Sequence, residues 1–208
     1  MEMVMRFSDS SEDVEVLSQL DNGAIEEKLI NVKDCAKELL RCSSIEYDLM
    51  EINNLDGHVL HYSRRSETER YVIKMPERKI KCTYKGKGYS LVHPTSIFSI
   101  DINIKEKVYT RINAFCIKKY EGGKTILYRY PFPNMLGSNS ICTGTISREA
   151  ADPVEAIMNV IEGNYTHDST SCKIKGTKEF FQAIKKEFPY DILENTGMTL
   201  ESFIKTWR

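Results

Sequence analysis

Apolar and polar residues alternate along much of the first third of the chain, which is the period of a β-strand with one buried face. Short runs of this kind cover residues 4–7, 14–20 and 25–30. The turn Asp21-Asn22-Gly23 separates the last two runs, and an Asn-Gly pair is a strong signal for a tight hairpin. The pattern therefore predicts an N-terminal β-meander.

Two interpretations are open for residues 24–42. Ile25, Leu29 and Val32 also fall on one helical face, so one long helix fits the same residues. We favour a break at Asn31, because its side chain can cap a helix that starts at the next residue. The apolar stripe of that shorter helix is Val32, Cys35, Ala36, Leu39 and Leu40.

The middle of the chain reads as a series of strands joined by short turns. Alternation over residues 45–49, a turn at Asp56-Gly57 and a return strand over residues 59–62 predict a hairpin. Glycine turns separate several of the apolar runs that follow. Further strands are expected over residues 71–73, 79–84, 89–94, 97–100, 107–118 and 126–128.

Three helices are expected in the last third of the chain. Asp152-Pro153 is a helix start signal, because aspartate caps a helix and proline suits its first turn. Thr177 is expected to cap a second helix, which Pro189 ends, and residues 199–207 can form a third. The first of these helices should bury Val154, Ile157, Met158 and Ile161.

These elements predict an α+β fold. We expect an N-terminal meander-and-helix subdomain over residues 1–87, followed by a main domain over residues 88–208. The main domain should be an antiparallel β-meander with flanking helices.

Composition narrows the possible partners and compartments. With 29 basic and 30 acidic residues the net charge is −1, so no overall field attracts nucleic acid or a membrane surface. The start of the chain lacks a signal-peptide pattern and no apolar run is long enough for a membrane span, which predicts a cytoplasmic protein. The six cysteines and four histidines lack the paired spacing of zinc sites, and neither a metal nor a cofactor is expected.

Residues 130–146 carry the candidate chemistry. Two prolines, Pro131 and Pro133, should lead the chain out of the sheet as an extended arm that ends at Asn134. A polar turn then leads to Ile141, an apolar residue that can pin the loop to the core, and to Cys142 among small residues. A thiol on an anchored, exposed loop with an amide donor nearby is the arrangement that acyl transfer through a thioester requires.

This segment resembles the active-site segment of ubiquitin-conjugating enzymes, in which a His-Pro-Asn tripeptide precedes a Gly-x-Ile-Cys-type turn. Phe132-Pro133-Asn134 stands in the place of the tripeptide, and Cys142 follows Asn134 at the family's spacing of eight residues. Pro-Phe-Pro-Asn, Ile-Cys-Thr-Gly and the later Asn164-Tyr165-Thr166-His167 are similar to the prokaryotic ubiquitin-conjugating-like family D, typified by PRTRC system protein B of bacterial mobile elements. The resemblance covers roughly residues 88–189, and it departs at Phe132, where the family has histidine.

The resemblance implies a fold like that of ubiquitin-conjugating enzymes and a transferase that carries a ubiquitin-like protein as a thioester on Cys142. Asn134 would then stabilise the oxyanion or hold the loop by side-chain hydrogen bonds. His167 and Asp168 are further candidates, as a base and as a residue that orients an incoming lysine. The implied partners are a ThiF-type activating enzyme, a small β-grasp ubiquitin-like protein and a protein acceptor.

Two other functions are open. A non-catalytic binding module could keep the same fold, and Phe132 in place of histidine favours it. A nucleic-acid-binding role would rest on a basic cluster near three tyrosines, although a solvated strand face explains the same residues and nucleic acid is the less favoured partner. That cluster is Lys74, Arg78, Lys79, Lys81, Lys85 and Lys87, with Tyr71, Tyr84 and Tyr89.

Overall fold

A computed structural model of the protein describes residues 2–6, 13–19, 25–34, 45–47, 53–54, 57–144, 146–149 and 152–206. Its contacts divide the chain into two compact units, Met1–Ile45 and Glu46–Arg208. Each unit is described by itself. Among the described residues, no helix combines the length and the apolar character that a membrane crossing requires.

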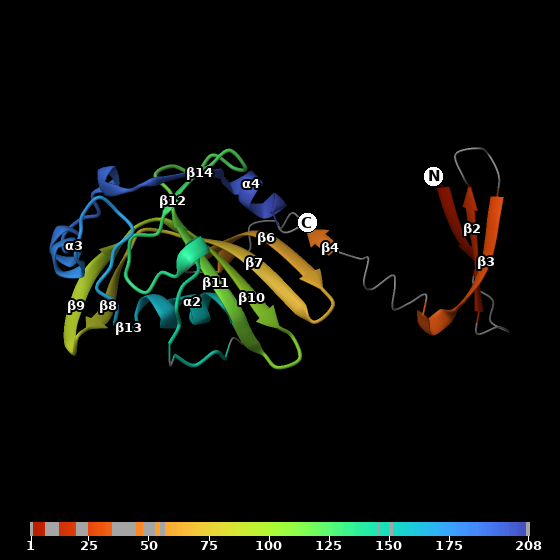
Figure 1. Ribbon diagram of the computed structural model, residues 1–208, viewed down its shortest axis with the longest axis horizontal. Coiled ribbons are helices and arrows are strands. Elements are labelled where there is room, and N and C mark those ends of the chain that lie inside the picture. Colours follow the sequence, from red (N-terminus) through yellow and green to blue (C-terminus); the bar gives the residue numbers. More distant parts are fainter. Residues whose placement is uncertain are drawn as a thin grey trace. The chain divides into compact units, whose positions relative to one another are not determined.

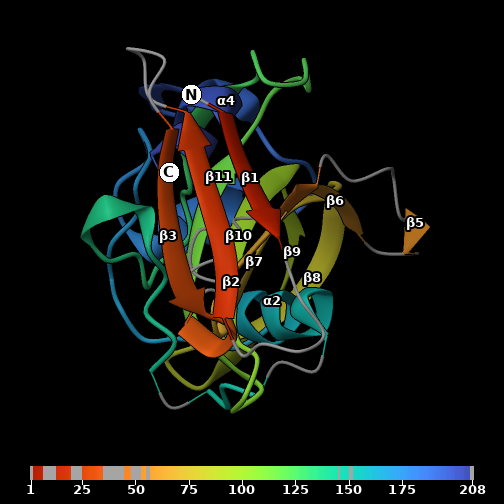
Figure 2. The same ribbon diagram turned by 90° about the vertical axis from the view of Figure 1, so that its right-hand side faces the viewer.

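The first unit contains a three-stranded antiparallel sheet, drawn in red and orange in Figure 2, with strands β1 (Glu2–Arg6), β2 (Asp13–Gln19) and β3 (Ile25–Asn31) in the order β1-β2-β3. Val14 and Val16 of β2 are buried and pack with Ile30 of β3, as the two-residue period predicts. The predicted N-terminal meander is therefore confirmed.

The break at Asn31 is also confirmed. Residues 25–31 pair with β2, so the long helix over residues 24–42 is wrong. The Asn31 side-chain oxygen accepts a hydrogen bond from the Lys33 N–H at 3.0 Å, and residues 32–34 are helical. The remainder of the helix expected through Leu40 lies outside the described residues.

The second unit is built on a curled, eight-stranded sheet (Figure 1). Seven of its strands follow the order β14-β12-β11-β10-β7-β6-β4, and β5 pairs with β6. Every pairing described in this sheet is antiparallel, which confirms an α+β fold. The strands are β4 (Ile45–Tyr47), β5 (Asn53–Asn54), β6 (Gly57–Arg65), β7 (Thr68–Met75), β10 (Ser96–Asn103), β11 (Val108–Cys116), β12 (Ile126–Arg129) and β14 (Asn195–Thr199).

A smaller sheet interrupts the meander between β7 and β10. It consists of β8 (Arg78–Tyr84), β9 (Lys87–His93) and β13 (Asn164–Tyr165), and β13 runs parallel to β8. The domain boundary expected between residues 87 and 88 falls at the start of β9. There, β8 and β9 form a hairpin and pair along their full length. Because those backbone hydrogen bonds hold both sides of that position in one sheet, the contacts divide the chain earlier, at Ile45.

The helices follow the predicted start signals with one exception. Helix α2 (Pro153–Ile161) is capped by Asp152, whose carboxylate accepts from the N–H groups of Val154 and Glu155. Helix α4 (Leu200–Lys205) has a reciprocal capping box between Thr199 and Ser202. Helix α3 (Thr177–Ala183) differs, because Gly176 stands at the cap position with φ of 91° and Thr177 is the first helical residue. It ends at Ala183, so the end predicted at Pro189 is wrong. Two short 3-10 turns, η1 (Gly137–Asn139) and η2 (Tyr190–Ile192), complete the unit.

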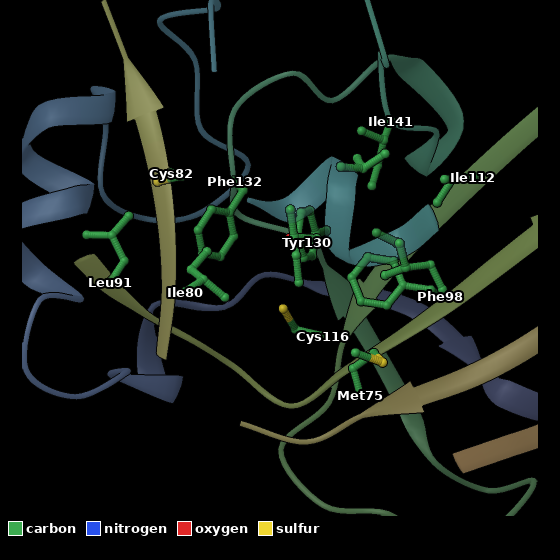
Figure 3. Packing of buried hydrophobic residues seen from close by; sticks show 14 of the residues in the cluster. Met75, Ile80, Cys82, Leu91, Phe98, Ile112, Cys116, Tyr130, Phe132 and Ile141 are labelled. Carbon is green, nitrogen blue, oxygen red and sulfur yellow. The ribbon is translucent and has the colours of Figure 1, made fainter. Parts of the chain in front are cut away.

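The large sheet has a hydrophobic cluster on each face. Successive residues such as Val72 and Ile73, or Phe115 and Cys116, belong to different clusters, as the alternation of a strand requires. The larger cluster includes buried residues of α2 and α3, and the smaller one includes Leu200 and Phe203 of α4. Figure 3 shows part of the larger cluster, where Tyr130 and Phe132 lie side by side.

One buried histidine in this cluster predicts a pH-dependent stability. His93 is fully buried, its Nε2 lies 2.8 Å from the Tyr130 hydroxyl, and burial lowers its pKa from 6.5 to about 3. Between these two pKa values, His93 is protonated in the unfolded chain and neutral in the folded protein. The free energy of unfolding should therefore fall as the pH drops from 6.5 towards 3, by up to about 1.4 kcal/mol per pH unit. Urea unfolding of wild type and of His93→Phe measures this difference.

The matched control is His167→Gln, because the residue that it replaces is exposed. With this variant, the free energy of unfolding should change with pH as it does in the wild type. With His93→Phe, it should change less with pH. Equal slopes in wild type and His93→Phe would contradict the assignment.

Candidate functional site

The arm that leads from β12 to the candidate site is buried, and it bends at residues 132–134 instead of running fully extended as the two prolines predicted. The chain leaves the sheet after Arg129, and residues 130–133 are all buried. The Phe132 ring lies 5.2 Å from the rings of His93 and Tyr130 and 5.3 Å from that of Phe180, centroid to centroid. Phe132 is thus a core residue with aromatic neighbours.

Asn134 ends this arm in a left-handed backbone conformation, with φ of 66°, which asparagine tolerates better than most residues. Its side-chain oxygen accepts hydrogen bonds from the backbone N–H groups of Thr166 and His167, both at 3.1 Å. Its amide nitrogen donates to the Asn164 carbonyl at 3.2 Å. The side chain therefore braces residues 164–167, which is one of the two roles that its sequence position suggests.

The loop that carries Cys142 is anchored at both of its sides. The Cys142 N–H donates to the Asn134 carbonyl at 2.7 Å, and the Leu136 N–H donates to the Ser140 carbonyl at 2.8 Å. Ile141 is 8 % exposed, and its N–H donates to the Ile112 carbonyl on β11 at 2.9 Å. The isoleucine thus pins the loop to the sheet as expected, and the cysteine follows it directly.

Cys142 differs in exposure from the other cysteines in the described part of the chain. It is half-buried, whereas Cys82, Cys116 and Cys172 are buried. Burial raises the pKa of the Cys82 thiol to about 12, and it also raises the pKa of Cys116 and Cys172. A buried thiol with a raised pKa is a poor nucleophile, so Cys142 is the one of these four that is placed to react. Cys35 and Cys42 lie outside the described residues.

An open pocket of about 310 Å³ adjoins Cys142. Its walls come from β11, from the loop before Cys142 and from the segment after it. Two arginines, Arg111 and Arg148, line it, and both side chains are exposed. Sequence reasoning missed them, because the alternation along residues 107–118 shows that Arg111 faces away from the core but not what lies beside it. The complete lining is Tyr109, Thr110, Arg111, Ile112, Leu136, Ser140, Ile141, Cys142, Thr143, Gly144 and Arg148.

The structure places His167 and Asp168 outside the walls of this pocket. His167 is exposed, and its backbone N–H is tied to Asn134. The Asp168 carboxylate accepts from the first N–H of α3, that of Thr177, at 3.3 Å and lies 3.2 Å from the Lys85 ammonium. The Tyr84 hydroxyl, this N–H group and the ammonium lower the pKa of Asp168. Asp168 therefore holds the start of a helix in this structure.

Two of the three tyrosines near the basic cluster are not free for base stacking. Tyr84 is buried, and Tyr89 packs edge-on against Phe181 with ring centroids 5.1 Å apart. Single-stranded nucleic acids are bound by exposed aromatic platforms, so the solvated strand face explains these lysines better. Within the described ranges, no three His, Cys, Asp or Glu side chains are grouped so that they could hold a metal ion.

Three comparisons with known proteins found no relative of this chain. No protein-family model, no curated protein and no solved structure matches the chain.

Proposed function

We propose that the protein is a ubiquitin-conjugating-like enzyme that carries a ubiquitin-like protein as a thioester on Cys142. The observation that carries the proposal is the position of this thiol, half-buried beside an open pocket on a loop anchored to Asn134 and to β11. The other cysteines of the described residues are buried. A nucleophile that must meet a second protein has to be both accessible and fixed. Cys142 is half-buried in the wall of an open pocket, and its loop is anchored.

The order of elements also supports a ubiquitin-conjugating-like fold. An antiparallel meander delivers its strand β12 to the arm, the arm leads to the anchored cysteine, and α2 follows. This is the order that the sequence resemblance implies for residues 88–189. We propose on the same grounds that the protein works in a bacterial or mobile-element conjugation system.

The proposed reaction has two transfers. A ThiF-type enzyme activates the C-terminal carboxyl of a β-grasp modifier with ATP and holds it as a thioester. The Cys142 thiolate attacks the carbonyl carbon, and the thiolate of the activating enzyme leaves. An amine of the acceptor then attacks the new thioester, and the Cys142 thiolate leaves as the amide bond forms. The direct test is a reductant-sensitive adduct on Cys142 when activating enzyme, modifier and ATP are present.

Asn134 is expected to act as a brace in this reaction. Asn134→Ala removes its hydrogen bonds to residues 164–167 and should lower the free energy of unfolding by about 1–3 kcal/mol. Charging of Cys142 and discharge to an amine should decline together, because the loop that carries the thiol loses its support. Thermal unfolding and single-turnover kinetics measure the two effects.

Asn134→Asp is the matched variant, because aspartate keeps the acceptor for Thr166 and His167 while it loses the donor and places a negative charge beside the Asn164 carbonyl. It should retain more stability and more charging than Asn134→Ala. Normal stability with discharge alone slowed by about 10²–10³ would instead show that the amide stabilises the oxyanion.

A non-catalytic binding module is the second candidate function. The observation that favours it is that the Asn134 amide is engaged with backbone groups and that neither His167 nor Asp168 lines the Cys142 pocket. A scaffold would need the surface of the fold and not the sulfur. Replacement of Cys142 therefore separates the two functions.

A further inference from the structure

The pocket beside Cys142 is positively charged. Arg111 and Arg148 line it, and no acidic residue is among its lining residues. Within the described part of the chain, neither guanidinium has a carboxylate within ion-pair distance, although several other basic side chains do. Two cations that share a pocket without a counter-charge repel one another, so an anion bound between them is stabilised.

Arg111 is held in place by the sheet. Its Nε donates to the Asn113 side-chain oxygen at 3.1 Å, and the Asn113 amide donates in turn to the Ser99 hydroxyl at 3.1 Å. Asn113 also forms a β-bridge with Ser140 of the cysteine loop. The two Nη groups of Arg111 have no hydrogen-bond acceptor among the described residues, and a fork of N–H groups fixed in this way suits a carboxylate.

Tyr109 supplies a third polar group. Its side chain is 2 % exposed, it lines the pocket, and its hydroxyl has no well-formed hydrogen bond within the described residues. Thr143 and Arg148 also line the pocket. The Thr143 side chain is a poorly aligned hydrogen-bond partner of this hydroxyl, and the Arg148 charge acts on it electrostatically. Burial raises the pKa of Tyr109, so the hydroxyl stays protonated and can donate. A buried hydroxyl whose hydrogen bond is poorly formed costs free energy that a better placed, bound acceptor would recover.

We propose that Arg111, Arg148 and the Tyr109 hydroxyl form an anion subsite beside Cys142, which we call the Arg111/Arg148 subsite, and that it binds a carboxylate of the peptide that is joined to this cysteine. The identity of the peptide rests on the proposed function, whereas the anion subsite itself does not. The tail of the modifier then carries an acidic residue close to the reacting carbon.

The first test compares two alkylating agents of the same shape and different charge. Iodoacetate and iodoacetamide both react when the Cys142 thiolate attacks the methylene carbon, a sulfur–carbon bond forms and iodide leaves. If the subsite binds a carboxylate, the rate ratio of iodoacetate to iodoacetamide at Cys142 should exceed the ratio for glutathione by about tenfold, as one charge-assisted contact provides. Peptide mapping after limited labelling gives both rates at Cys142.

Two double variants test whether the two arginines cause the preference for iodoacetate. Arg111→Gln with Arg148→Gln should return the ratio to that of glutathione. Arg64→Gln with Arg65→Gln removes the same charge from the β6–β7 hairpin, outside the lining of the pocket, and should leave the ratio unchanged. A wild-type ratio equal to that of glutathione, or an equal loss in the two double variants, would overturn the proposal.

The second test does not need a reactive thiol. In Cys142→Ser protein, acetate should shift the Nε–H resonances of Arg111 and Arg148 saturably, while chloride at the same ionic strength should not. Tyr109→Phe should weaken acetate binding and keep the melting temperature, because the lost hydroxyl has no well-formed hydrogen bond. A parallel titration with inorganic phosphate tells a phosphate site from a carboxylate site. Shifts that grow without saturation, or saturation by phosphate alone, would contradict a carboxylate subsite.

The two proposals fail separately. If alkylation shows the charge preference but Cys142 is never charged by a modifier, the subsite stands and the proposed function falls. If charging occurs and the double arginine variant neither changes the alkylation ratio nor slows charging, the proposed function stands and the subsite falls.

Discussion

Cys142→Ala should abolish every reductant-sensitive adduct that the protein forms with an activated modifier. Wild type, mixed with the activating enzyme, the modifier and ATP, should form an adduct that a thiol reductant cleaves. The loss should be complete, since alanine has no nucleophile and the other described cysteines are buried. Non-reducing gel electrophoresis measures the adduct.

Other replacements of the same residue test the chemistry more finely. Cys142→Ser and Cys142→Lys should form an ester or an amide that survives reductant. Cys172→Ala is the matched control, because it removes a buried sulfur and leaves the pocket intact; this variant should still be charged. If Cys142→Ala keeps its partner complexes and its biological activity, the protein is a scaffold and the catalytic proposal is wrong.

Phe132→Ala should lower the free energy of unfolding by about 3–5 kcal/mol. The Phe132 side chain is fully buried, and five aromatic rings have centroids within 6.5 Å of its own. Truncation therefore leaves a cavity that these rigid neighbours cannot close. Chemical denaturation followed by circular dichroism measures the loss. Leu136→Ala is the matched control on the same segment, because its side chain is 51 % exposed, and it should change stability by less than about 0.5 kcal/mol.

Phe132→His tests whether the family's histidine could serve at this position. The imidazole would have to exchange water for a fully buried site walled by aromatic rings, which should cost about 1–3 kcal/mol. Faster charging of a stable Phe132→His protein would show that the phenyl group is a functional loss. A destabilised protein with no gain in charging would show that it belongs to the core.

The outline of the fold could be read from local pattern. The β2–β3 hairpin follows from Asp21-Asn22-Gly23, helix α2 from Asp152-Pro153 and helix α4 from Thr199. Each of these signals acts within a few residues, through backbone conformation or a capping hydrogen bond, so it is present in the sequence itself. Thr177 was mistaken for a cap because Gly176 takes that position and the Asp168 carboxylate reaches the first N–H of α3 from nine residues away.

At the candidate site, too, the sequence predicted local features and missed contacts between distant segments. The sequence singled out Cys142 and Asn134, since turn residues, prolines and one isoleucine around them form a short, recognisable segment. It did not show that the Asn134 side chain holds residues 164–167 or that Arg148 lies near Arg111. Those contacts depend on how segments far apart in the sequence meet.

By itself, the sequence determined most of the strands, the starts of two helices and the loop that carries the half-buried thiol, because period, turn chemistry and capping are properties of neighbouring residues. It did not predict the strands β13 and β14, which are defined by their pairing with β8 and β12. Only the tertiary structure decided that β8 and β9 form a separate sheet with β13 and that two arginines line a pocket with Cys142. It also decided that the Asp168 carboxylate accepts a hydrogen bond from the first N–H of α3. The physical reason is that register and packing between distant segments are settled by the burial of the whole core, which no local pattern encodes.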